Sequence, residues 1–190
     1  MKLTAAIGAL ALVAVVGHGL SAATAREQRR ERAERWQGTR SGAETPARTL
    51  SYGADPLQKI DFYRAATPAA PLVVFVHGGG WKRGDKTMMR GSPKLTDWHG
   101  KGYAVASVNY RLVPAATVEQ QAADVAQAVA TMRKRAPELG FDPGRIVLVG
   151  HSAGAHLVAL VGTDPQWLRG AGLGMDAVRG VIPLDGAAYD

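Results

Sequence analysis

The sequence predicts an α/β fold, with a mostly parallel sheet and helices on both of its faces. From residue 49 onward, short β-branched runs alternate with longer stretches of helical periodicity, which is typical of such folds. The runs at 72–76 and 146–149 are continuously apolar, as expected for central parallel strands. With 190 residues, 46% of them hydrophobic, the chain has room for one domain, and disorder of the whole is excluded.

About six strands are expected, and five of them can be assigned to ranges. Residues 57–63 alternate apolar and polar side chains with period two, which predicts an early strand with one wetter face. Further strands are expected at 72–76, 103–108, 146–149 and 178–184.

One long helix is indicated by apolar residues at helical spacing, which form a single stripe: Val118, Ala122, Val125, Val129 and Met132. Thr117 and Gln120 match a capping box at its start, and Pro137 is expected to limit its far end. Asp142-Pro143-Gly144 then predicts a turn that begins the next strand. We expect this helix to cover one face of the sheet.

The N-terminal part predicts an export signal. Lys2 precedes an apolar stretch at 3–16, and Ala23-Thr24-Ala25 has the form of a cleavage site. The stretch is shorter than the ~20 residues of a spanning helix, so removal after Ala25 is expected rather than a stable membrane span. Residues 1–25 are therefore predicted to be a signal peptide of an exported protein, periplasmic or secreted, and residues 26–48 a flexible charged leader. The predicted domain spans residues 49–190.

Composition excludes several kinds of partner and cofactor. Eight of the 23 basic and four of the 16 acidic residues lie in positions 1–48, so the net charge of +7 divides into +4 there and +3 in the remainder. The densest basic run is interrupted by glutamates, so no nucleic-acid partner is expected. With no cysteine, thiol nucleophiles, disulfides and thiolate zinc sites are excluded.

A glycine-rich loop, His77-Gly78-Gly79-Gly80-Trp81, directly follows the strand predicted at 72–76. Three consecutive glycines cost backbone entropy and contribute no packing, so their small size or their access to positive φ must be required. A backbone that presents adjacent N–H groups to a negative oxygen has this requirement, because a Cβ would block close approach. We favour this interpretation over an ordinary flexible turn.

A second loop, Gly150-His151-Ser152-Ala153-Gly154, lies between the strand at 146–149 and an apolar segment at 155–161. This is the G-x-S-x-G pattern in the strand, turn and helix context that a nucleophilic serine requires. The turn is so tight that its flanking residues collide unless they are small, which explains the glycines at both ends. Ser152 is thereby held above the sheet, with the N–H of Ala153 near a developing oxyanion.

The two loops, 75 residues apart from His77 to Ser152, resemble those of the α/β-hydrolase superfamily. More narrowly, they are similar to the hormone-sensitive-lipase-like and feruloyl-esterase-like carboxylesterases and the related arylformamidases. The segments 84–86 (GDK) and 108–112 (VNYRL) add to the resemblance, which covers about residues 50–190.

The resemblance implies a serine carboxylic-ester hydrolase that acts through an acyl-enzyme on a small-molecule ester. Such a reaction needs neither a metal nor an organic cofactor, and none is expected. Ser152 would be the nucleophile, and the N–H groups of Gly79, Gly80 and Ala153 would form the oxyanion hole. The supporting residues would be His77, which braces the glycine loop, together with Gly78, Trp81, Gly150 and Gly154.

A catalytic acid and histidine are harder to place. The superfamily order is serine, acid, histidine, and the only histidine after Ser152 is His156, one helical turn away and directed into packing. Asp185, after the last predicted strand, is an acid candidate, with a structural or pocket-rim carboxylate as the favoured alternative. Since the superfamily fold has eight strands, the last strands are expected to be missing and this fragment to be inactive by itself.

Three alternatives stay open: an amidase of arylformamidase type, a non-catalytic binding module on the hydrolase scaffold, and a degenerate remnant. The substrate ester and the oligomeric state are not predicted.

Overall fold

A six-stranded sheet organises residues 45–186, the part of the chain that the computed structural model describes. The strands are β1 (Arg48–Ser51), β2 (Lys59–Tyr63), β3 (Ala70–Val76), β4 (Ala104–Val108), β5 (Phe141–His151) and β6 (Gly180–Leu184). Their order across the sheet is β1-β2-β4-β3-β5-β6. β3 to β6 run parallel, whereas β2 pairs antiparallel with both β1 and β4. The predicted α/β class is therefore confirmed.

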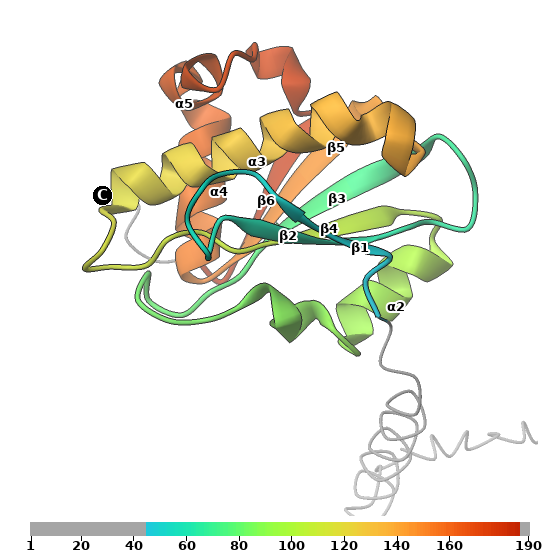
Figure 1. Ribbon diagram of the computed structural model, residues 1–190, viewed down its shortest axis with the longest axis horizontal. Coiled ribbons are helices and arrows are strands. Elements are labelled where there is room, and N and C mark those ends of the chain that lie inside the picture. The colour runs from blue at the N-terminus through green and yellow to red at the C-terminus, as the bar shows by residue number, and fades with distance from the viewer. Residues whose placement is uncertain (1–44, 187–190) are drawn as a thin grey trace, which may run out of the picture. The chain divides into compact units, whose positions relative to one another are not determined.

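Helices cover both faces of this sheet. They are α2 (Pro93–Gly100), α3 (Val118–Leu139), α4 (Ala153–Thr163) and α5 (Pro165–Gly170), with short 3₁₀ turns η2 (Lys86–Met89) and η3 (Met175–Ala177). Figure 1 shows α3, α4 and α5 on one side of the sheet and α2 on the other. Right-handed crossovers account for this division, because the chain moves across the sheet in one direction from β3 to β4 and in the other from β4 to β5.

Each face has its own hydrophobic core. Alternate residues of β3 enter the two cores: Leu72 and Val74 pack under α3 and α4, whereas Val73 and Phe75 pack with Leu95 of α2. This double coverage explains why β3 is continuously apolar. The segments that follow β3 and β4 emerge at the same end of the sheet, at the left in Figure 1.

The predicted wetter face of the strand at 57–63 is wrong. β2 is buried along nearly its whole length, and the Asp61 side chain is fully buried. Its carboxylate accepts hydrogen bonds from Arg90 at 2.9 Å and from Thr49 at 2.7 Å, and it lies 3.4 Å from Lys86 Nζ. The alternation in sequence thus reflects a buried ion-pair cluster and not contact with water.

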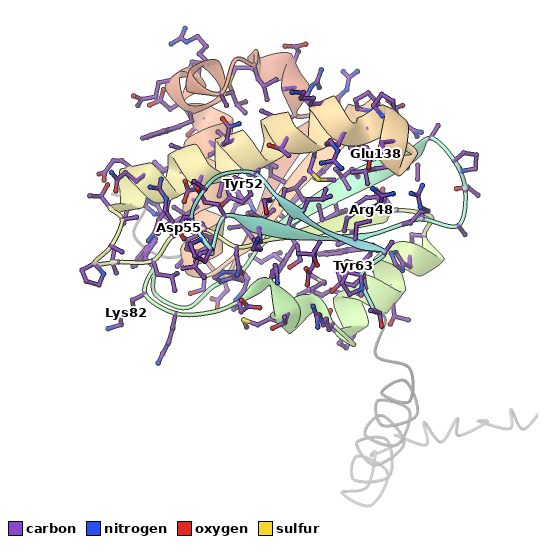
Figure 2. All side chains as sticks on the ribbon, in the orientation of Figure 1. Arg48, Tyr52, Asp55, Tyr63, Lys82 and Glu138 are labelled. Atoms are coloured by element: carbon purple, nitrogen blue, oxygen red, sulfur yellow. The ribbon has the colours of Figure 1, made fainter. Side chains whose placement is uncertain are left out.

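β1 is the strand that the sequence patterns did not assign to a range. Its four residues pair with β2, and only Leu50 is buried. Arg48 forms an ion pair with Glu138 near the end of α3, which ties this edge strand to the helix layer (Figure 2). So short a strand with one buried residue has too little periodicity to be recognised.

α3 begins as predicted but ends later. Both hydrogen bonds of the Thr117 and Gln120 capping box are present. The prediction that Pro137 limits the helix is wrong, since the helix passes through it to Leu139 and ends at Gly140, which has φ 81°. The proline removes only the one intrahelical bond that an N–H at position 137 would donate, and the helix ends at Gly140, three residues later.

β5 is also longer than predicted. Asp142-Pro143-Gly144 lies inside the strand, where the pairing with β3 shifts register between Phe141 and Ile146. Gly144 N–H still donates to Asp142 Oδ1 at 2.8 Å, so the expected turn chemistry forms within an irregular stretch of the strand.

The predicted signal peptide and nearly all of the predicted leader lie outside the described residues, and these predictions stay as they are. Among residues 45–186, no helix is long and apolar enough to cross a membrane.

Candidate active site

Ser152 occupies the sharp corner between β5 and α4. Its backbone has φ 53° and ψ −120°, a conformation that a non-glycine residue adopts only under constraint from its surroundings. Its N–H donates to Leu184 O of β6 at 2.9 Å. Although Ser152 is the N-cap residue of α4, its side chain forms no capping hydrogen bond. The hydroxyl is therefore not used to hold the helix.

The glycines on either side of this corner have no space for a side chain. A Cβ on Gly150 would lie 2.1 Å from Gly154 O, and a Cβ on Gly154 would lie 2.2 Å from Val76 O and 2.5 Å from His77 O. The first turn of α4 thus packs directly against the end of β3. This contact brings the glycine loop to the serine corner.

The glycine loop lies against Ser152. A Cβ on Gly78 would lie 3.0 Å from Ser152 Cβ and 2.8 Å from His151 O, which is closer than ordinary van der Waals contact. Gly79 and Gly80 have φ of 131° and 59°, the positive region that glycine adopts without strain. The loop therefore needs glycine for its small size at Gly78 and for its access to positive φ at Gly79 and Gly80, which are the two reasons expected from the sequence.

Three backbone N–H groups at this place have no partner. Among the described residues, no carbonyl or side chain accepts a hydrogen bond from the N–H of Gly79, Gly80 or Ala153. Ala153 is also the first residue of α4, so the partial positive charge of the helix N-terminus is centred there. Unpaired backbone donors beside a serine hydroxyl can stabilise an oxyanion.

His77 holds the start of the loop. The residue is 1% exposed. Its ring stacks on Tyr110 at a centroid distance of 4.5 Å, and its Nδ1 lies 2.9 Å from Gly78 O. Because a carbonyl oxygen only accepts, Nδ1 carries the proton. Burial lowers the pKa of His77 below its usual value, so the ring is neutral near pH 7. These contacts fit a bracing residue.

The two other histidines of the site lie beside the glycine loop. His151 Nδ1 is 3.1 Å from the position that a Cβ on Gly78 would take. His156 lies one turn along α4, and its ring packs edge-on against Trp81 at 5.7 Å. Burial lowers the pKa of His156. As expected from helix geometry, this ring is directed into packing against the loop.

Asp185 directly follows β6, at the end of the sheet where Ser152 lies. Leu184 is paired with His151, and its carbonyl binds Ser152 N–H, so Asp185 begins beside the serine corner. Asp185 is exposed and has φ 50°. Its position suits a carboxylate at the rim of the site.

The sequence patterns gave no role to Asn109 and Asp85, which the structure brings together. Asn109 Nδ2 donates to Asp85 Oδ2 at 2.7 Å, although the two residues are 24 positions apart. Both lie in segments that were noted only for their resemblance to hydrolases, and no spacing rule could have paired them.

Within residues 45–186, no group of three or more histidine, aspartate or glutamate side chains is arranged to hold a metal ion.

Comparisons with known proteins show the family and the fold of this chain. The family model BD-FAE matches residues 60–169. Esterase LipC of Mycobacterium tuberculosis is 34% identical over 144 residues, which cover 70% of this chain and 36% of LipC. The isoprenylcysteine alpha-carbonyl methylesterase ICME of Arabidopsis thaliana is 34% identical over 114 residues, or 59% of this chain and 26% of that protein. The chain thus spans about a third or less of the length of these relatives.

Among solved structures, Thermogutta terrifontis esterase 2 phosphonylated by cyclosarin superposes with a TM-score of 0.63 at 28% identity. The match covers 77% of this chain and 57% of that one. Esterase B of Lactobacillus rhamnosis has a TM-score of 0.58 at 25% identity, covering 86% and 54%. These neighbours confirm the α/β-hydrolase fold expected from the two loops.

Proposed function

Because this chain belongs to the BD-FAE family, we propose that it carries the nucleophile and oxyanion hole of a serine carboxylic-ester hydrolase. The observation that carries the proposal is the contact between Gly78 and Ser152, where a Cβ on the glycine would lie 3.0 Å from the serine Cβ. This contact supports the proposal because Gly79 and Gly80, whose N–H groups have no partner among the described residues, directly follow Gly78 in the loop. The Ser152 hydroxyl forms no capping hydrogen bond, and the N–H of Ala153 next to it is also unpaired. The esterase relatives support the same reaction class.

In the proposed reaction, Ser152 Oγ attacks the carbonyl carbon of the ester, and its proton passes to a histidine base. The resulting oxyanion accepts hydrogen bonds from Gly79, Gly80 and Ala153. Collapse expels the alcohol, which takes the proton from the histidine, and leaves an acyl-enzyme. Water then releases the acid and regenerates the hydroxyl.

The base and its acid partner are proposed to lie beyond residue 190 in the complete enzyme. Ser152 precedes both in the superfamily order, and the only later histidine, His156, packs against Trp81. Asp185 is then a rim carboxylate and not the triad acid. A chain extended through the next acid and histidine should hydrolyse p-nitrophenyl acetate, whereas residues 1–190 should not. Equal turnover by both would contradict this assignment.

The nucleophile itself is tested with a fluorophosphonate probe on the extended chain. The probe should label Ser152, and Ser152→Ala should abolish labelling without changing the thermal unfolding midpoint by more than a few degrees. Failure to label would favour a non-catalytic binding module or a degenerate remnant on the same scaffold. Faster turnover of N-formylkynurenine than of p-nitrophenyl acetate would favour the arylformamidase alternative.

We also propose that the protein is exported after removal of residues 1–25, on the sequence pattern alone. N-terminal sequencing of the mature protein should find Arg26 as its first residue, and an intact Met1 on a soluble cytosolic form would contradict export.

A further inference from the structure

The segment after β4 binds both ends of the loop that carries the oxyanion donors. Tyr110 Oη donates to His77 O at 3.0 Å, at the start of the loop. Asn109 binds the far end, because its Nδ2 donates to Asp85 Oδ2 at 2.7 Å and its Oδ1 accepts from Lys86 N–H at 2.5 Å. Residues 77–86 are therefore clamped at two points by adjacent residues.

Asn109 is itself buried, and further hydrogen bonds hold its backbone. It is 4% exposed, its N–H donates to Lys59 O at 2.9 Å, and its carbonyl accepts from Tyr52 Oη at 2.5 Å. Arg111, two residues further on, pairs with the buried carboxylate of Asp124 through its guanidinium at 2.7 Å and its N–H at 3.0 Å. Asn109 therefore has a fixed position from which it holds Asp85.

From Asp85, direct contacts lead to the nucleophile. Gly84 has φ 108°, and a Cβ there would lie 2.3 Å from Gly78 O and 2.4 Å from His77 Nδ1. Gly78 on its other side contacts Ser152. The Gly78 peptide is thus held between Gly84 and the serine corner, and a shift of Asp85 would move Gly84 and then the glycine amides.

We propose that Asn109 is a positioning residue, which sets the oxyanion amides against Ser152 by holding Asp85 and, through it, Gly84. The kinetic consequence rests on the proposed esterase function, whereas the effect on the loop does not. Asn109 touches neither the substrate nor the reacting atoms in this account.

Exchanging the two side chains tests the pairing. In Asn109→Asp, two carboxylates face each other; in Asp85→Asn, a single amide oxygen must serve both Thr87 N–H and Asn109 Nδ2, so one bond is lost. In the double exchange all bonds can re-form, because the carboxylate at 109 accepts from Lys86 N–H and from the amide at 85, whose oxygen accepts from Thr87 N–H. Asp164→Asn is the matched control, since Asp164 also caps a helix, about 18 Å along α4 from Ser152.

On the complete chain, each single exchange should lower kcat for p-nitrophenyl acetate about 10-fold, with KM changed less than about 2-fold, because the misplaced donors act in the transition state. The double exchange should recover most of the loss, and the control should match the wild type. Wild-type kcat in the single exchanges, or a double exchange no better than either of them, would overturn the proposal even if stability falls.

Hydrogen–deuterium exchange gives a second readout that does not depend on turnover. The amides of Lys82 and Lys86, which donate to Gly79 O and to Asn109 Oδ1, should exchange faster in each single variant and return toward wild-type protection in the double exchange. If the wild type hydrolyses no ester, the proposed function fails, and this measurement alone decides the positioning role. Unchanged protection in the single variants would overturn it.

Discussion

Adding one methyl group at Gly78 perturbs the contact on which the site depends. In Gly78→Ala, the new Cβ would lie 2.8 Å from His151 O and 3.0 Å from Ser152 Cβ, where ordinary contacts begin at about 3.4 Å. Relief requires a movement of about 0.5 Å between the glycine loop and the serine corner. Since a misplacement of about 1 Å can cost about 100-fold and loss of one oxyanion donor about 100- to 1,000-fold, we expect kcat to fall roughly 10- to 100-fold.

The same substitution should destabilise the domain only moderately. Overpacking costs about 1–3 kcal/mol, or roughly 2–10 °C in Tm for a domain of this size, so the variant stays folded at 25 °C. Gly100→Ala is the control, because a Cβ there meets nothing within 4 Å. Esterase turnover of the complete chain and thermal unfolding are the assays. Wild-type kcat in Gly78→Ala, with Tm lowered or not, would refute the reasoning.

Four further outcomes are expected. Ser152→Ala should lower turnover by at least about 10⁴-fold, as measured with p-nitrophenyl acetate, and a smaller loss would place the nucleophile elsewhere. Gly154→Ala should lose both kcat and stability, because its Cβ would lie 2.2 Å from Val76 O; a circular-dichroism melt at the wild-type Tm would contradict this close packing. Asp61→Asn should cost about 1–3 kcal/mol in urea unfolding, since the buried acceptor that pairs with Arg90 and Lys86 loses its charge. Asp97→Asn in an exposed pair should cost under about 0.5 kcal/mol, and equal costs would count against the buried cluster. Burial lowers the pKa of His77 below 6.5, so the contribution of the neutral ring to stability is full above pH 6.5 and is lost as the pH falls through the folded-state pKa. His77→Asn should therefore reduce the dependence of the unfolding free energy on pH between about pH 7.5 and 5. An unchanged dependence would show that His77 does not titrate in this range.

Local patterns predicted those parts of the molecule whose causes are local. The capping box at Thr117 and the G-x-S-x-G turn at Ser152 each depend on residues within five positions, and both have the expected geometry. The glycines of both loops were expected from small size or access to positive φ. A Cβ would meet close neighbours at Gly78, Gly79, Gly150 and Gly154, whereas Gly80 has open space around it and adopts φ 59°.

The features that were predicted wrongly or missed depend on contacts between segments that are distant in the sequence. Asp61 alternates with apolar neighbours as an exposed residue would, yet it is buried and pairs with Lys86 of η2 and with Arg90, which directly follows η2. Pro137 ends a helix in most contexts, yet here it falls in a last turn that Gly140 closes. The bond between Asn109 and Asp85 joins the ends of separate strand-to-helix connections, so no periodicity or spacing in the sequence could have shown it.

A crystal structure of the complete chain with Ser152 phosphonylated tests the central claim most directly. The account predicts phosphorus bonded to Ser152 Oγ and the phosphonyl oxygen about 2.7–3.1 Å from the amide nitrogens of Gly79, Gly80 and Ala153. A phosphonyl oxygen directed away from these three amides, or an adduct on another residue, would contradict it.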